Sequence, residues 1–97
     1  MKEAEEFHKL LLNLKVVPTI SSLTRKFDQI CRRELEKTFQ KMPELSPEGR
    51  EALERMAYAI ANKILHDPMI ALKEEDSERS QSDYANTLRK MFRLDEV

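Results

Sequence analysis

Apolar residues recur at intervals of three and four positions along most of this chain, and the alternation typical of strands does not appear. Positions three and four apart lie on one side of an α-helix, so this spacing predicts amphipathic helices. Residues 2–15 form the first predicted helical segment. Its apolar stripe consists of Phe7, Leu10, Leu11 and Leu14.

Prolines divide the rest of the pattern. Pro18 predicts a break or the first turn of a new helix, because proline fits the first helical position without losing a hydrogen bond. A long second helix of about six turns should follow and end before Pro43, at the usual 3.6 residues per turn. Its apolar positions are Ile20, Leu23, Phe27, Ile30, Leu35, Phe39 and Met42.

A third helix is predicted after the loop PELSPEG. Ser46 has the chemistry of an N-cap and Pro47 suits the first helical position, whereas Gly49 stands where a glutamate would complete a capping box. The buried side of this helix should carry Leu53, Met56, Ala57, Ile60, Ile64 and Leu65.

The stretch NKILHDP, residues 62–68, admits a catalytic cluster or a helix junction. We favour the junction. His66 would lie in the last turn of the third helix, where it suits the negative helix end. Asp67 would cap a short fourth helix that begins at Pro68. Asn62 lies one turn before His66 and can form a hydrogen bond across the junction.

The end of the chain is predicted to hold a polar linker and one more helix. Residues 73–83 are acidic and polar, which favours a mobile linker. Residues 84–94 form a short amphipathic pattern with Tyr84, Leu88, Met91 and Phe92. The predicted fold class is therefore all-α, without internal repeats.

Composition and charge agree with charged amphipathic helices. The chain has 97 residues, 36% of them charged, one glycine and a net charge of −1. Such a short chain is one domain at most, and a partner would help it to bury apolar surface. Charge is uneven, because residues 24–41 hold six Lys or Arg against three acids. That basic face could contact RNA phosphates, although solvated charges are the commoner explanation.

Little in the sequence points to catalysis or metal binding. Gly49 is the only glycine, which excludes the glycine-rich loops that cradle phosphate. One Cys and two His are too few and too widely spaced for a typical zinc site. Cys31 and His66 could act as nucleophile and base only if the fold joined them. We expect Cys31 to be a small buried hydrophobic residue. No apolar run approaches the ~20 residues that span a bilayer, and the acidic start does not resemble a signal peptide.

Three segments together resemble the carboxy-terminal dimerisation domain of glutamyl-tRNA reductase. They are VPTISSLTRKFDQICRRELEKTF, LSPEGREALERMAYAIANKILHDP and LRKMFRLDE. The matching motifs are Val17–Ile20, Glu34-Leu35, Leu45-Ser46, Asn62–Pro68 and Met91–Leu94. Departures from the family pattern are Ile64 for the usual leucine, Gly49 where acids are common, and Met91 before Phe92.

The resemblance implies a role in a larger enzyme. Residues 1–15 would end a long connecting helix, and residues 16–97 would form a dimerisation domain that pairs into a two-fold helical bundle. The family's cytoplasmic enzyme uses NADPH to reduce glutamyl-tRNA to glutamate-1-semialdehyde in tetrapyrrole (porphyrin) biosynthesis. Its catalytic cysteine and its cofactor site lie in other domains, so Cys31 inherits no role. This chain should therefore hold no catalytic, cofactor or metal residues.

The expected partner is a second copy of the chain. Candidates for the core or the dimer contact are Ile20, Leu23, Phe27, Ile30, Leu35, Phe39, Leu53, Met56, Ile60 and Ile64. The alternative function is a helical module that binds tRNA or a protein through the basic face of residues 24–41. A small self-contained enzyme is a third class, distinguished by activity in the isolated chain.

Overall fold

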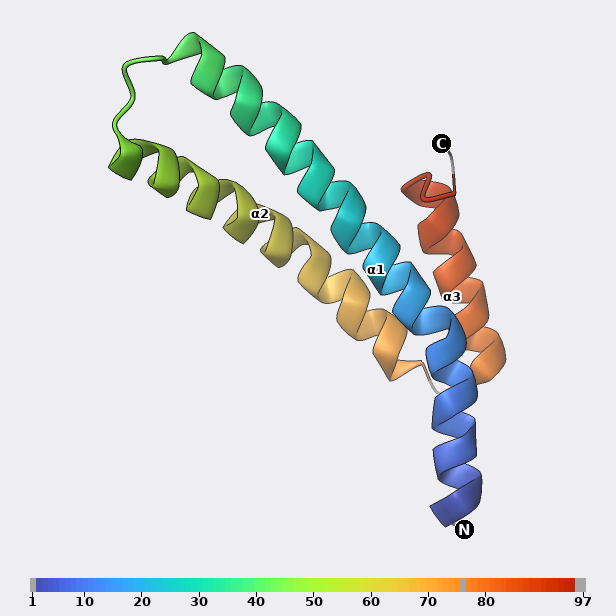
Figure 1. The fold of residues 1–97 in the computed structure, drawn as a ribbon. Helices are drawn as coiled ribbons and strands as arrows, with labels where there is room; N and C mark the ends of the chain where they lie inside the picture. The colour runs from blue at the N-terminus through green and yellow to red at the C-terminus, as the bar shows by residue number, and fades with distance from the viewer. Residues whose placement is uncertain (1, 76, 96–97) are drawn as a thin grey trace.

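The fold is a long helical hairpin with a third helix packed at one end. The computed structural model describes the backbone of residues 2–75 and 77–95, and the side chains of residues 16–75, 77 and 79–95. Within these residues the chain forms α1 (Lys2–Lys41), α2 (Pro47–Glu74) and α3 (Glu78–Met91), with no strand. Helices α1 and α2 run antiparallel, and α3 lies beside the first half of α1 (Figure 1). The all-α prediction is confirmed.

The predicted break at Pro18 is wrong, because α1 is one helix of 40 residues that contains this proline. Val16, Thr19 and Leu23 flank Pro18 at helical spacing and are all buried, whereas Pro18 itself is exposed. Packing of this buried face outweighs the hydrogen bond that proline cannot donate. The predicted stripe of Phe7, Leu10, Leu11 and Leu14 lies outside the described side chains.

The predicted junction at Asp67-Pro68 is also wrong. Helix α2 runs unbroken from Pro47 to Glu74, and Pro68 lies in its interior. Leu65 and Leu72 are buried on one face of α2, seven residues apart and on either side of Pro68. Their common burial against the core requires the helix to continue, so no fourth helix begins here.

The start of α2 matches the prediction. Ser46 has extended backbone angles, φ −66° and ψ 158°, and its side-chain oxygen accepts a hydrogen bond from the Gly49 N–H at 3.0 Å. Pro47 occupies the first helical position. This arrangement is an N-cap, which satisfies one of the free N–H groups at the helix start. Helix α1 ends at Lys41, just before Pro43 as predicted.

Helix α3 starts six residues earlier than predicted, inside the stretch expected to be a linker. Ser77 is its N-cap and accepts a hydrogen bond from the Ser80 N–H at 3.0 Å. The buried stripe of the helix is Gln81, Ala85 and Leu88. Gln81 is polar, but its amide nitrogen donates to the Leu72 carbonyl oxygen at 3.1 Å and so ties α3 to the end of α2.

A sharp turn ends α3 at Met91, short of the predicted end at residue 94. The Leu94 N–H donates to the Arg89 carbonyl at 2.9 Å and the Arg93 N–H to the Lys90 carbonyl at 3.3 Å. With Arg93 at φ 52°, these bonds form a Schellman motif, which usually has glycine at the left-handed position. The turn brings the ring of Phe92 to 5.8 Å from that of Phe27.

The hydrophobic core lies where the three helices meet. Its buried members are Val16, Leu23, Leu65, Leu72, Ala85 and Leu88. Half-buried side chains around them include Ile20, Phe27, Met69, Tyr84, Phe92 and Leu94. The far end of the molecule, from about residue 30 to residue 64, is a two-helix hairpin that α3 does not reach (Figure 1). Two helices alone bury little of their apolar surface, so apolar side chains stay exposed at this end.

Candidate functional site

Large apolar side chains are exposed along the open end of the hairpin. On α2, Met56, Ile60 and Ile64 are 55%, 51% and 54% exposed, and they follow one another at intervals of four residues. On α1, Ile30 is 46% exposed. Four-residue spacing places the α2 residues in one row along the helix.

These residues lie on the same side of the hairpin. Cys31 Sγ approaches the Ala57 carbonyl oxygen at 3.7 Å, which sets the register of α1 against α2. A shallow groove of about 160 Å³ crosses the two helices there and is lined by Glu34, Leu35, Thr38, Leu53, Met56 and Ala57. Ile30 lies one turn before Glu34, and Ile60 one turn beyond Met56. We call the surface formed by Ile30, Leu53, Met56, Ile60 and Ile64 the hairpin face.

A contiguous apolar surface of this kind is typical of a protein contact. Its members are aliphatic or thioether side chains, which offer neither acid, base nor nucleophile. Covering them would remove apolar area from water, which contributes about 25 cal/mol per Å² in favour of association, against the entropic cost of bringing two chains together. The chemistry available to the hairpin face is therefore association with another apolar surface.

The ten residues predicted for the core or the dimer contact divide by burial. Leu23 is fully buried in the core. Half-buried positions are Ile20, Phe27, Leu35, Phe39 and Leu53. The exposed positions are Ile30, Met56, Ile60 and Ile64, all on the hairpin face. Sequence reasoning missed Val16, Leu72 and the buried polar pair Thr19 and Gln81, because predicted breaks interrupted the periodic pattern around them.

The residues of the predicted junction have no capping role. Asn62, His66 and Asp67 are exposed on α2, and Pro68 is half-buried. His66 Nδ1 and Asp67 Oδ1 are 3.2 Å apart, with the Asp67 side chain 96% exposed. Neighbouring charges in open solvent contribute little to stability. Asp67 cannot be an N-cap, because it lies inside α2, whose N-cap is Ser46.

Cys31 and His66 do not form a catalytic pair. Cys31 is half-buried between α1 and α2 and contacts the Ala57 carbonyl, which agrees with a packing role more than with an active thiol. His66 lies more than two turns further along α2 than Ala57, about 13 Å at 1.5 Å per residue. The fold therefore keeps Cys31 and His66 apart, so His66 cannot act as a general base for the Cys31 thiol.

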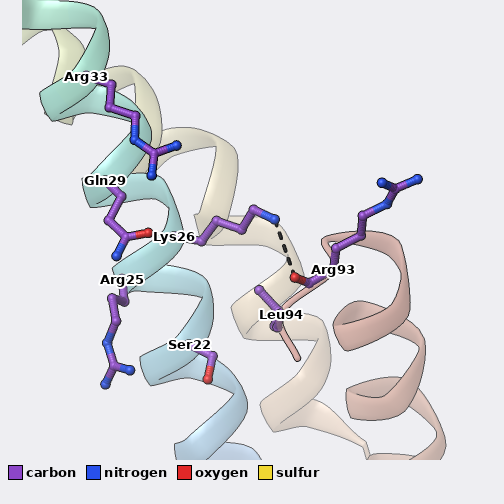
Figure 2. A pocket seen from close by; sticks show the side chains of 7 residues that line it. All are labelled: Ser22, Arg25, Lys26, Gln29, Arg33, Arg93 and Leu94. Atoms are coloured by element: carbon purple, nitrogen blue, oxygen red, sulfur yellow. Dashed lines mark hydrogen bonds between the residues drawn. The ribbon is translucent and has the colours of Figure 1, made fainter. Parts of the chain in front are cut away.

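A second groove lies between α1 and the turn that ends α3 (Figure 2). It has a volume of about 370 Å³ and is lined by Ser22, Arg25, Lys26, Gln29, Arg33, Arg93 and Leu94. Lys26 Nζ donates to the Phe92 carbonyl oxygen at 2.7 Å and to that of Arg93 at 3.4 Å. The predicted basic stretch 24–41 supplies three of the cations. Arg93 was missed, because only the turn after α3 brings it to α1.

The described residues contain neither a metal-binding cluster nor a helix that could span a membrane. No group of three or more His, Cys, Asp or Glu side chains is placed to hold a metal ion among those residues. In this part of the chain no helix is long and apolar enough to cross a membrane.

Comparison with known proteins gives a consistent family. Residues 1–94 match the model for "Glutamyl-tRNAGlu reductase, dimerisation domain". The glutamyl-tRNA reductase of Geotalea daltonii is 43% identical over 94 residues, which are 97% of this chain and 22% of the relative. That of Geobacter metallireducens is 41% identical over 93 residues, 96% of this chain and 21% of the relative. No solved structure gives a significant match.

The chain spans about a fifth of the length of the curated relatives that it matches. The match to the family model covers nearly all of the chain, and it includes α1, α2, α3 and the turn after α3. On this evidence the chain belongs to the glutamyl-tRNA reductase dimerisation-domain family.

Proposed function

We propose that two copies of this chain pair through their hairpin faces into a two-fold helical bundle. The observation that carries the proposal is the row of Met56, Ile60 and Ile64, each more than half exposed, beside Ile30. In a symmetric dimer the same patch occurs on both subunits, so an apolar row can cover its own copy. The dimer would give the open hairpin the second layer that α3 provides at the other end.

The pairing supports a role in a longer enzyme. The relatives are named glutamyl-tRNA reductases. We propose that the protein containing this chain reduces glutamyl-tRNA to glutamate-1-semialdehyde with NADPH in the cytoplasm, for tetrapyrrole (porphyrin) biosynthesis. The nucleophile and the NADPH site would come from other domains of that enzyme. This chain would hold two subunits together and contribute neither.

We propose that the chain consists of two parts with different roles. Residues 1–15 would belong to a connecting helix and residues 16–97 to the dimerisation domain. Helix α1 crosses this boundary without interruption. A rigid helix through the boundary would fix the orientation of an upstream domain relative to the dimer. The boundary is therefore one of function and not of secondary structure.

The test is the mass of the 97-residue chain in solution, by sedimentation equilibrium or light scattering at micromolar concentration. We expect a dimer for the wild type and a monomer for Ile60→Lys, because a charge would be buried in the contact. Asn62→Lys is the matched control, since it adds the same charge to an exposed position of α2 that is not in the apolar row. It should remain dimeric.

Circular dichroism must show that both variants keep their helical content. A monomeric wild type would refute the pairing. A dimer of Ile60→Lys as tight as that of the wild type would show that subunits pair through another surface.

A further inference from the structure

The groove between α1 and the turn after α3 is lined by four cationic side chains, while the chain as a whole has a net charge of −1. They are Arg25, Lys26, Arg33 and Arg93, and no acid lines this groove among the described residues. Acids do lie nearby in sequence, but other arginines pair with them. Arg32 binds Asp28 at 3.2 Å and Arg89 binds Asp95 at 2.7 Å. The two acids named here are thus paired with arginines that do not line the groove, and they do not neutralise Arg25 or Arg33.

The cations of α1 are arranged in a row. Arg25, Gln29 and Arg33 follow at four-residue spacing, so they extend over about 12 Å of helix axis at 1.5 Å per residue. Arg25 and Arg33 are exposed. Within the described residues, neither makes a hydrogen bond or ion pair to the protein. Their guanidinium groups remain available to a ligand, and Gln29 lies between them with an amide that can also donate (Figure 2).

The other wall is held in place by Lys26. Its ammonium group donates to the Phe92 and Arg93 carbonyl oxygens, which belong to the turn that ends α3. Phe27 also packs against Phe92, with ring centroids 5.8 Å apart. These contacts fix the turn beside α1, so the groove is a formed feature of the fold. Lys26 adds its charge, but two carbonyls already occupy its ammonium group, and we regard it as a positioning residue.

Arginine pairs well with phosphate, because its planar fork of N–H donors matches two phosphate oxygens. Arg25 and Arg33 lie about 12 Å apart along the helix axis, a separation that suits contacts to successive phosphates of a chain. Among the described residues, Leu94 is the only apolar side chain that lines the groove, and it is half-buried. A lipid surface would need a broad exposed apolar face beside the cations.

Bases have no platform here, since the two aromatic rings near the groove, Phe27 and Phe92, are half-buried against each other. Contact would thus be made to the sugar–phosphate backbone, which positions a nucleic acid without reading its sequence. We propose that this groove binds the phosphate backbone of RNA, with Arg25 and Arg33 as the phosphate contacts and Gln29 beside them. The choice of RNA, and of tRNA as its source, rests on the proposed function.

The experiment measures binding of the 97-residue chain to a fluorescein-labelled glutamate-accepting tRNA transcript by fluorescence anisotropy, over a series of salt concentrations. The test variant is the double substitution Arg25→Gln with Arg33→Gln. The matched control is Lys63→Gln with Lys73→Gln, which removes the same charge from exposed positions on α2. Circular dichroism verifies that all samples are folded.

Each phosphate contact contributes about 0.7–0.9 to the steepness with which log K falls against log salt concentration. Two contacts therefore add about 1.4–1.8 to log K at 0.1 M salt relative to 1 M salt. We expect the test variant to lose roughly 25- to 60-fold in affinity at 0.1 M salt and the slope to fall by the same 1.4–1.8. The control should bind as the wild type does.

Equal weakening by test and control variants would overturn the groove as the site, because it would reflect overall charge. No binding of tRNA, with binding to vesicles that contain phosphatidylserine, would replace RNA by a membrane surface. Sedimentation of the same samples separates this proposal from the pairing of subunits. A dimer that fails to bind tRNA refutes only the groove, and a monomer that binds tRNA through Arg25 and Arg33 refutes only the pairing.

Discussion

Replacing Pro68 by alanine should raise the free energy of unfolding. Pro68 lies inside α2, where proline lacks the N–H that the helix uses and costs about 3 kcal/mol relative to alanine. The substitution also removes two ring methylenes from a half-buried position, a loss of about 0.8 kcal/mol at 0.8 kcal/mol for each fully buried methylene. The expected net gain is about 2 kcal/mol.

Asp67→Ala is a second test of the same point. The substitution should lower the free energy of unfolding if Asp67 caps a helix, and should not lower it if Asp67 lies in a helix interior. Loss of an N-cap would cost about 0.5–2 kcal/mol. In the interior of α2, alanine has the better helix propensity, by up to about 0.7 kcal/mol. The exposed contact of Asp67 with His66 offsets little of that gain. We therefore expect Asp67→Ala to leave stability unchanged or slightly higher.

The assay is urea unfolding followed by circular dichroism at fixed protein concentration, since the stability of a dimer depends on concentration. Asn62→Ala is a suitable control, because Asn62 is exposed on the same helix and far from a proline. The reasoning fails if Pro68→Ala lowers stability, or if Asp67→Ala costs 1 kcal/mol or more. Either result would mean that a helix ends and another begins at Asp67-Pro68 in solution.

Two further substitutions test the core and the start of α3. Leu23→Ala should cost about 2–5 kcal/mol, because Leu23 is fully buried where the three helices meet; the same unfolding assay measures it, and a loss below 1 kcal/mol would contradict the described core. Ser77→Ala should cost about 0.5–2 kcal/mol, because its side chain caps the Ser80 N–H, and Ser77→Asp should preserve the cap. Equal losses for alanine and aspartate at position 77 would count against capping.

The predicted dimer contact and the proposed RNA groove occupy different parts of the hairpin. The hairpin face combines α1 with α2, whereas the groove combines α1 with the turn after α3. Helix α1 contributes to both, and Ile30 and Arg33 are neighbours on its surface because they lie three residues apart. The two proposals are tested separately, because Ile60→Lys changes α2 whereas Arg25→Gln with Arg33→Gln changes α1.

Local patterns in the sequence were sufficient for several features. The three- and four-residue spacing of apolar side chains predicts an all-α fold, because no other regular structure has this period. Ser46 followed by Pro47 correctly predicts the start of α2, since capping depends on a few adjacent atoms. The same spacing placed Met56, Ile60 and Ile64 on the buried side of their helix, whereas all three are exposed in this chain.

Other features depend on contacts between distant parts of the chain. A proline inside a helix costs about 3 kcal/mol locally, and the sequence alone predicts a break. Val16 and Leu23 around Pro18, and Leu65 and Leu72 around Pro68, are buried in one core with Ala85 and Leu88 of α3, and this burial offsets the cost. The tertiary structure also decides which apolar residues are covered. Leu23 lies under α3, whereas Ile60 lies beyond its reach and stays exposed, because a single short helix covers only one end of the hairpin.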